Sequence, residues 1–198
     1  MKIYKNTSGF SIIEILIGMF IFSMWIISIY AIISSSVRVN EYNKNYIIAS
    51  NLAREQLELL RNNRDFNYEK LQKFDQINPP LRDQLNPLDD FSNVFLDDTY
   101  YKIQNNIAAT ASFPISIDEI SATDFTDDTK YQLCLDTNNM YIYCPSWTWL
   151  KKTVFFKYVS IDRTLWDDTL KISSKVIWKS RGIHEFEVKT ILSDWKQL

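Results

Sequence analysis

Apolar residues are distributed unevenly along the chain, and one run near the N-terminus is long enough to cross a membrane. Residues 10–33 read FSIIEILIGMFIFSMWIISIYAII, in which Glu14 is the only charged residue. A helix of this length reaches about 36 Å, whereas the hydrocarbon core of a bilayer is about 30 Å thick. The pattern therefore predicts a membrane-inserted helix over residues 10–33.

The charges on either side of this run predict its orientation. Lys2 and Lys5 precede it, and the first charged side chains that follow it are Arg38 and Glu41. Because positive residues stay on the cytoplasmic side, residues 1–9 are expected in the cytoplasm and the rest of the chain outside. We therefore expect a single-pass protein of the cytoplasmic (inner) membrane whose N-terminus is inside.

The helical pattern continues beyond the apolar run, now with one apolar and one polar face. Residues 34–64 contain no Gly or Pro, and opposite charges lie four residues apart at Arg54–Glu58 and Arg61–Asp65. Apolar residues recur at steps of three and four: Tyr42, Tyr46, Ala49, Ala53, Leu57 and Leu60. This pattern predicts an amphipathic helix over residues 34–65, ending near residues 62–67 and packing on a sheet of its own head.

The rest of the chain, residues 66–198, carries loop and strand signals. Prolines and acidic pairs in residues 66–98 predict a variable loop region. Alternating, β-branched and aromatic stretches predict strands at 100–107, 130–135, 140–144, 152–161, 170–178 and 184–192. Strands that follow one long helix predict an α+β fold, in which the long N-terminal α-helix packs on an antiparallel β-sheet head.

Composition and charge exclude several classes of function. The 198 residues are 46% hydrophobic and 23% charged, as in globular proteins, and the net charge is −2. This balance predicts no nucleic-acid partner, because such proteins usually show a basic stripe. His184, the only histidine, is expected at a strand end, and no catalytic motif is visible. We therefore predict no enzyme activity, no cofactor and no metal site, and we interpret four acidic doublets as solvated loop charge: 89–90, 97–98, 127–128 and 167–168.

The two cysteines, Cys134 and Cys144, are predicted to form a disulfide. Both lie outside the cytoplasm in the predicted topology, where disulfides persist. With a three-residue loop at 138–140, the two positions fall opposite one another across a hairpin. The alternative is two separate thiols, in a cell that does not oxidise its envelope proteins.

Glu14 stands inside the apolar run, where an unpaired carboxylate costs a few kcal/mol and therefore indicates a partner. The sequence Gly9-Phe10-Ser11-Ile12-Ile13-Glu14 resembles the processing site of type IV pilins and type II secretion pseudopilins. The resemblance implies that prepilin peptidase removes a leader, residues 1–9, by cleavage between Gly9 and Phe10. It further implies N-methylation of Phe10 and an assembly salt bridge between Glu14 and an N-terminal ammonium group.

Two other segments resemble V-type minor pilins. Residues 176–195 resemble the C-terminal hairpin and terminal Trp of those proteins. Residues 49–68 carry the matching positions Ala49, Leu52, Ala53, Glu55, Glu58, Arg61, Arg64 and Asp65. The resemblance implies a minor pilin of a type IV pilus or related filament, outside the cell or in the periplasm. Its implied partners are prepilin peptidase, other pilin subunits, the pilus assembly machinery and, before assembly, membrane lipid.

The sequence is also compatible with two alternatives to a minor pilin. A pseudopilin of type II secretion or of a competence system is the first, because it shares the same processing site. The second belongs to another class: a signal-anchored extracellular binding module, such as an adhesin or receptor. Such a module would need no processing at Gly9.

Overall fold

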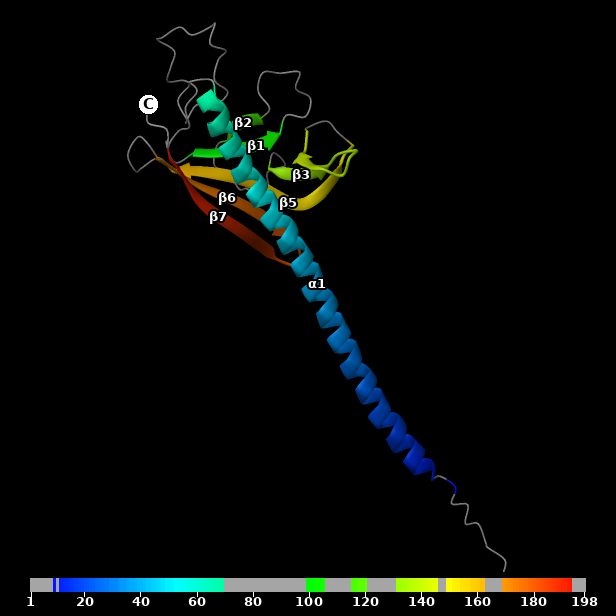
Figure 1. The fold of residues 1–198 in the computed structure, drawn as a ribbon. Helices are drawn as coiled ribbons and strands as arrows, with labels where there is room; N and C mark the ends of the chain where they lie inside the picture. The colour runs from blue at the N-terminus through cyan, green and yellow to red at the C-terminus, as the bar shows by residue number, and fades with distance from the viewer. Residues whose placement is uncertain are drawn as a thin grey trace, which may run out of the picture. The chain divides into compact units, whose positions relative to one another are not determined.

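A computed structural model of the chain describes residues 9, 11–69, 99–105, 115–120, 131–145, 149–162 and 169–193. It confirms the predicted α+β class, with one long N-terminal helix and an antiparallel β-sheet. Contacts within the chain divide it into two compact units, Met1–Lys44 and Asn45–Leu198. Helix α1 runs from Ile12 to Glu69 and contributes to both units (Figure 1).

The first unit contains the apolar part of α1. Every large apolar side chain from Ile12 to Ile33 is at least 51% exposed, and the helix is long and apolar enough to cross a membrane. Two serines lie within this stretch, and each donates its hydroxyl to a carbonyl of the preceding turn. Ser23 Oγ is 2.7 Å from the Met19 oxygen, and Ser28 Oγ is 2.9 Å from the Met24 oxygen. These hydroxyls are therefore satisfied inside the helix, which suits a hydrocarbon environment.

The second unit is built on an antiparallel sheet, of which the structure describes seven strands. They are β1 (Thr99–Asn105), β2 (Ile115–Ile120), β3 (Gln132–Leu135), β4 (Tyr141–Tyr143), β5 (Lys151–Asp162), β6 (Thr169–Lys179) and β7 (Ile183–Ser193). One edge of β5 pairs with β6, which pairs with β7. The other edge of β5 pairs with β3 near its start and with β1 near its end, and β4 and β2 extend the sheet beyond them.

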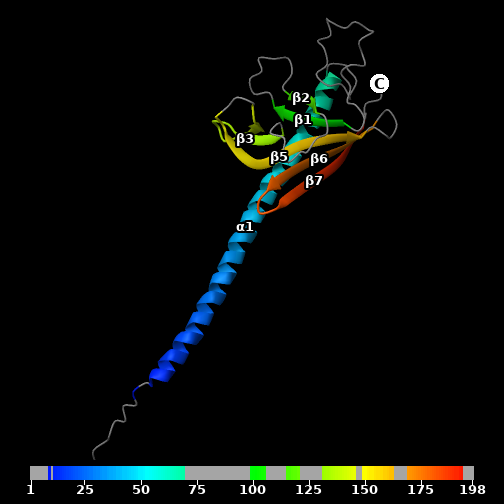
Figure 2. The same cartoon turned by 180° about the vertical axis from the view of Figure 1, so that it is seen from behind.

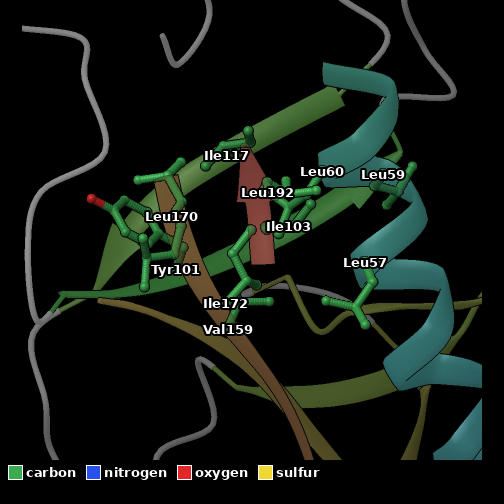
Figure 3. Close-up of a cluster of buried hydrophobic side chains, with 11 residues drawn as sticks. Leu57, Leu59, Leu60, Tyr101, Ile103, Ile117, Val159, Leu170, Ile172 and Leu192 are labelled. Carbon is green, nitrogen blue, oxygen red and sulfur yellow. The ribbon is translucent and has the colours of Figure 1, made fainter. Parts of the chain in front are cut away.

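Residues 45–69 of α1 lie across one face of this sheet (Figures 1 and 2). The predicted apolar stripe explains the packing, because Ala49, Ala53, Leu57 and Leu60 are all buried. Figure 3 shows one part of the core, in which side chains from the helix face side chains from the strands. That cluster contains Leu57, Leu59, Leu60, Tyr101, Ile103, Ile117, Val159, Ile161, Leu170, Ile172 and Leu192.

Alternation along the strands also gives the sheet an apolar cluster on its other face. On β5, Phe155 and Val159 belong to clusters that include α1 residues, whereas Phe156 and Tyr158 pack in a third cluster with Ile177. Because successive strand residues point to opposite sides, this third cluster lies on the face away from α1. Both faces of the sheet are therefore partly apolar.

Three local predictions differ from the structure. Helix α1 continues to Glu69, beyond the predicted end. The helix ion pairs are Arg61–Glu58 at 3.4 Å and Arg64–Asp65 at 2.9 Å, not the predicted pairs four residues apart. Strand β2 was not predicted, because Asp118 and Glu119 interrupt its apolar pattern and only pairing with β1 makes it a strand.

Candidate functional site

The first turn of α1 is the part of the predicted processing site that the structure describes. The helix begins where the Glu14 and Ile15 N–H groups donate to the Ser11 oxygen, at 3.0 and 3.3 Å. Gly9 precedes this turn and is exposed, and no heavy atom lies within 4 Å of where its Cβ would be. Phe10 lies outside the described residues. The backbone at Gly9 is therefore sterically open.

Glu14 lies in the first turn of α1, where the helix dipole favours a negative charge. Its side chain forms no ion pair with any residue that the structure describes. It is surrounded along the helix by exposed apolar side chains, including Ile13 at 63% and Ile17 at 54%. A carboxylate in such a setting lacks a compensating positive charge within the described part of the chain.

In the second unit, a buried polar network joins α1 to the sheet. Gln56 is fully buried, and its Nε2 donates to the Tyr143 hydroxyl at 3.4 Å. The Ser174 hydroxyl lies 2.7 Å from Gln56 Oε1 and 3.0 Å from the Ala53 oxygen. The Tyr143 hydroxyl donates to the Lys157 carbonyl at 3.2 Å. Because buried polar groups are costly when unsatisfied, this network selects one register of the helix on the sheet.

Lys157 is the buried charge of this region, with a side chain only 1% exposed. Its Nζ lies 3.7 Å from Glu55 Oε1 and 5.4 Å from the centre of the Tyr143 ring. The ammonium group has no hydrogen-bond partner among the described residues. Burial lowers the pKa of Lys157, an effect that the carboxylate of Glu55 opposes. Burial likewise raises the pKa of the Tyr143 phenol.

Replacing Lys157 by Met is expected to stabilise the head by about 1 kcal/mol at pH 7, because it removes the desolvation of a buried cation. Native Lys157 releases its proton at a lower pH than the unfolded chain, whose lysine has the ordinary pKa of 10.5. The unfolded state therefore binds more protons between the two values, and wild-type stability rises with pH there. The advantage of Lys157→Met should shrink as pH approaches 10.5.

Urea unfolding of the full chain in detergent micelles, followed by tryptophan fluorescence, measures this difference. The variant Glu55→Gln is the matched comparison, and it is expected to lose about 1 kcal/mol because it leaves the cation without its carboxylate. A Lys157→Met protein that is less stable than wild type at pH 7 would show that the ammonium group contributes favourably.

The structure joins Cys134 and Cys144 by a disulfide, with 5.0 Å between the Cα atoms. The predicted register of the hairpin is wrong by two residues, because Cys134 pairs with Ile142 rather than with Cys144. The turn is longer than predicted, since the Asp136 carboxylate accepts the N–H groups of Asn138 and Met140. Cys144 follows the end of β4, and its N–H donates to the Gln132 oxygen at 2.9 Å.

The remaining predicted groups are not brought together in the described structure. His184 is the second residue of β7, where its ring stacks on Trp178 at 5.4 Å and Nε2 lies 3.1 Å from the Ser180 oxygen. The four acidic doublets lie outside the described residues. Within the described ranges, no cluster of three or more His, Cys, Asp or Glu side chains is arranged to hold a metal ion.

Sequence reasoning missed the Gln56 network and the buried Lys157. A signal for both was present in the sequence. Gln56 interrupts the apolar stripe of the helix, and Lys157 interrupts the run VFFKYV. A polar residue at a core position indicates a buried partner, but the pattern does not name that partner.

Comparison with known proteins gives one match. Residues 4–30 match the family model of the prokaryotic N-terminal methylation motif, a span that contains Gly9, Phe10 and Glu14. No curated protein and no solved structure is significantly similar to the chain.

Proposed function

We propose that this chain, which carries the N-terminal signature of type IV pilins and pseudopilins at residues 4–30, is a minor pilin of a type IV pilus or related filament. The signature itself implies processing by prepilin peptidase and assembly with other pilin subunits. Families with this signature are structural, and the apolar helix suggests membrane anchoring followed by a place in a surface filament. The finer assignment to a minor subunit rests on the V-type segments at 49–68 and 176–195.

The observation that carries the proposal is an exposed apolar helix whose one carboxylate, near its start, forms no ion pair with a described residue. Cleavage after Gly9 places a new ammonium group at Phe10, four residues before Glu14. This separation is about one helical turn, or about 6 Å along the axis. In a medium of low dielectric, a carboxylate and an ammonium group attract strongly, so Glu14 pairs with its own or a neighbour's N-terminus as helices bundle.

The helix has two successive environments in this mechanism. Before assembly, lipid surrounds residues 12–33, with residues 1–9 in the cytoplasm and the head outside. During assembly, neighbouring helices replace lipid around the same side chains. The internally bonded hydroxyls of Ser23 and Ser28 support this proposal, because they need no partner in either environment.

Mass spectrometry of the N-terminal peptide tests the proposal on membranes and on sheared surface filaments. The expected result is a chain that begins at N-methyl-Phe10 and is present in the sheared fraction. An intact Met1 found only in membranes would contradict it and would favour a signal-anchored binding module.

The variant Gly9→Val is expected to block cleavage, so that only the full-length chain is recovered. The matched control is Gly18→Val, because Gly18 also has no heavy atom within 4 Å of its Cβ position but lies beyond the cleavage site. The control should be processed like wild type. Equal processing of both variants would contradict the assignment of the cleavage site.

Deletion of the gene distinguishes the hypothesis of a pilus subunit from that of a pseudopilus subunit. If the chain is a minor pilin, its loss is expected to reduce the amount of surface filament while secretion of extracellular enzymes continues. Loss of secretion with filaments unchanged would instead identify a type II secretion pseudopilin.

A further inference from the structure

The sheet face away from α1 contains a hollow of about 660 Å³, lined by side chains of β5, β6 and β7 together with Tyr100 of β1. Its volume falls within the range of small-molecule sites, about 300–1,000 Å³. The register explains why it forms. Ser160 on β5 and Ser173 on β6 are direct cross-strand partners and both line the hollow. The flanking positions on the same face hold longer side chains, so two adjacent small residues leave a depression between them.

Charged groups surround this depression with one excess positive charge. The lining contains three lysines, Lys171, Lys175 and Lys189, and two carboxylates, Asp162 and Glu187. The excess lies on the lysines and gives the hollow an attraction for anions. Unlike a nucleic-acid groove, the hollow also contains carboxylates, which repel a phosphate backbone.

Glu187 forms ion pairs with two of the three lysines. Its Oε1 lies 3.6 Å from Lys175 Nζ, and its Oε2 lies 3.5 Å from Lys189 Nζ. The Ser173 hydroxyl donates to the same carboxylate, and this hydrogen bond is the main reason why the pKa of Glu187 is lowered. Lys171 forms no ion pair with any described residue, although it is the cross-strand partner of Asp162. Its ammonium group is therefore available to a ligand.

Two tyrosines form the aromatic side of the hollow. The rings of Tyr100 and Tyr158 lie 5.7 Å apart at an angle of 71°. Burial raises the pKa of Tyr158 to about 12, so its phenol remains protonated near neutral pH and can donate a hydrogen bond. An aromatic ring beside hydroxyls and carboxylates offers packing for an apolar ring face and acceptors for ligand hydroxyls.

We propose that this hollow binds an acidic saccharide of one or two sugar units, whose carboxylate pairs with Lys171. The carboxylates of Asp162 and Glu187 accept hydrogen bonds from sugar hydroxyls, and Tyr100 packs against the sugar ring. An extended acidic peptide fits less well, because peptides add to a sheet edge and the hollow lies over β6, between β5 and β7. The site stands apart from filament assembly, which uses the N-terminal helix.

Isothermal titration calorimetry on the full chain in detergent micelles tests the proposal. The probe is digalacturonate, and its neutral counterpart is galactobiose. Saturable binding of digalacturonate is expected, with binding of galactobiose at least about tenfold weaker because it lacks the charge-assisted contact. Lys171→Gln should weaken binding of digalacturonate about tenfold for the same reason. The matched control is Lys152→Gln, an exposed lysine of β5 outside the hollow, which should bind like wild type.

A second variant tests the hollow itself. Ser160→Leu fills it without changing charge and should abolish binding, while near-UV circular dichroism checks that the head remains folded. Absence of saturable binding to the wild type would overturn the proposal, as would equal affinity for galactobiose. Tighter binding of tetraglutamate than of digalacturonate would overturn the saccharide assignment. Because the assay uses isolated chains, none of these results bears on filament assembly.

Discussion

Replacing Glu14 by alanine is expected to leave the chain in the membrane and to reduce its recovery in sheared filaments about tenfold or more. The substitution makes the apolar run of residues 10–33 fully uncharged, so membrane insertion is retained. What is lost is the charge that, in the proposed assembly, pairs with an N-terminal ammonium group. The strength of such a pair in low dielectric exceeds the 1.4 kcal/mol that corresponds to about a tenfold effect.

Immunoblots of membrane and sheared fractions measure the distribution of the chain. The matched control is Glu41→Ala, which removes the same charge from the same helix but outside the apolar run. It should appear in sheared filaments at the wild-type level. Recovery of Glu14→Ala at that level would contradict a role of this carboxylate in assembly.

Replacing Trp178 by alanine should cost the head about 3–5 kcal/mol of unfolding free energy, because it opens a large cavity in a packed core. Trp178 is fully buried on β6 and belongs to a cluster with Ala49, Ala53 and Phe155. The two alanines belong to α1, and their short side chains cannot reach into the space that the indole leaves. Since domains are stable by only about 5–15 kcal/mol, this variant should be close to unfolding at 37 °C.

Trp149→Ala is the matched control for this prediction. The Trp149 side chain is fully exposed, so its removal should change stability by no more than about 0.5 kcal/mol. Urea unfolding of the full chain in detergent, followed by far-UV circular dichroism, measures both variants. Similar stabilities for the two variants would show that the cluster around Trp178 does not control the stability of the head.

The strands of the head were predictable to different degrees. Strands β5, β6 and β7 were predicted almost to their ends. Residues 152–161 and 170–178 are rich in β-branched and aromatic side chains, residues 184–192 alternate, and the hairpin between β6 and β7 is local. Strand β2 was not predicted, because its pattern is weak and it exists through pairing with β1. The β3–β4 hairpin was predicted in kind but not in register. Its register depends on Asp136, which binds the backbone of its own turn and lengthens the loop.

The sequence by itself determined the N-terminal part of this protein. An apolar run of 24 residues, one carboxylate and the Gly9-Phe10 pair are local features of the sequence. Reading them needs no knowledge of which distant residues come together. The methylation motif at residues 4–30 accordingly matches a family model without help from the head.

Only the tertiary structure decided the polar chemistry of the head. Ser174 and Gln56 are 118 residues apart in sequence, and they meet because β6 passes beneath α1. Lys157 of β5 meets Glu55 of α1 in the same way. The hollow forms because the register of β5 and β6 places Ser160 beside Ser173. Hydrophobic periodicity states which face of an element is buried, but it contains no information about which element covers that face. Partners across the core are therefore fixed by sheet order and register, which are properties of the folded chain.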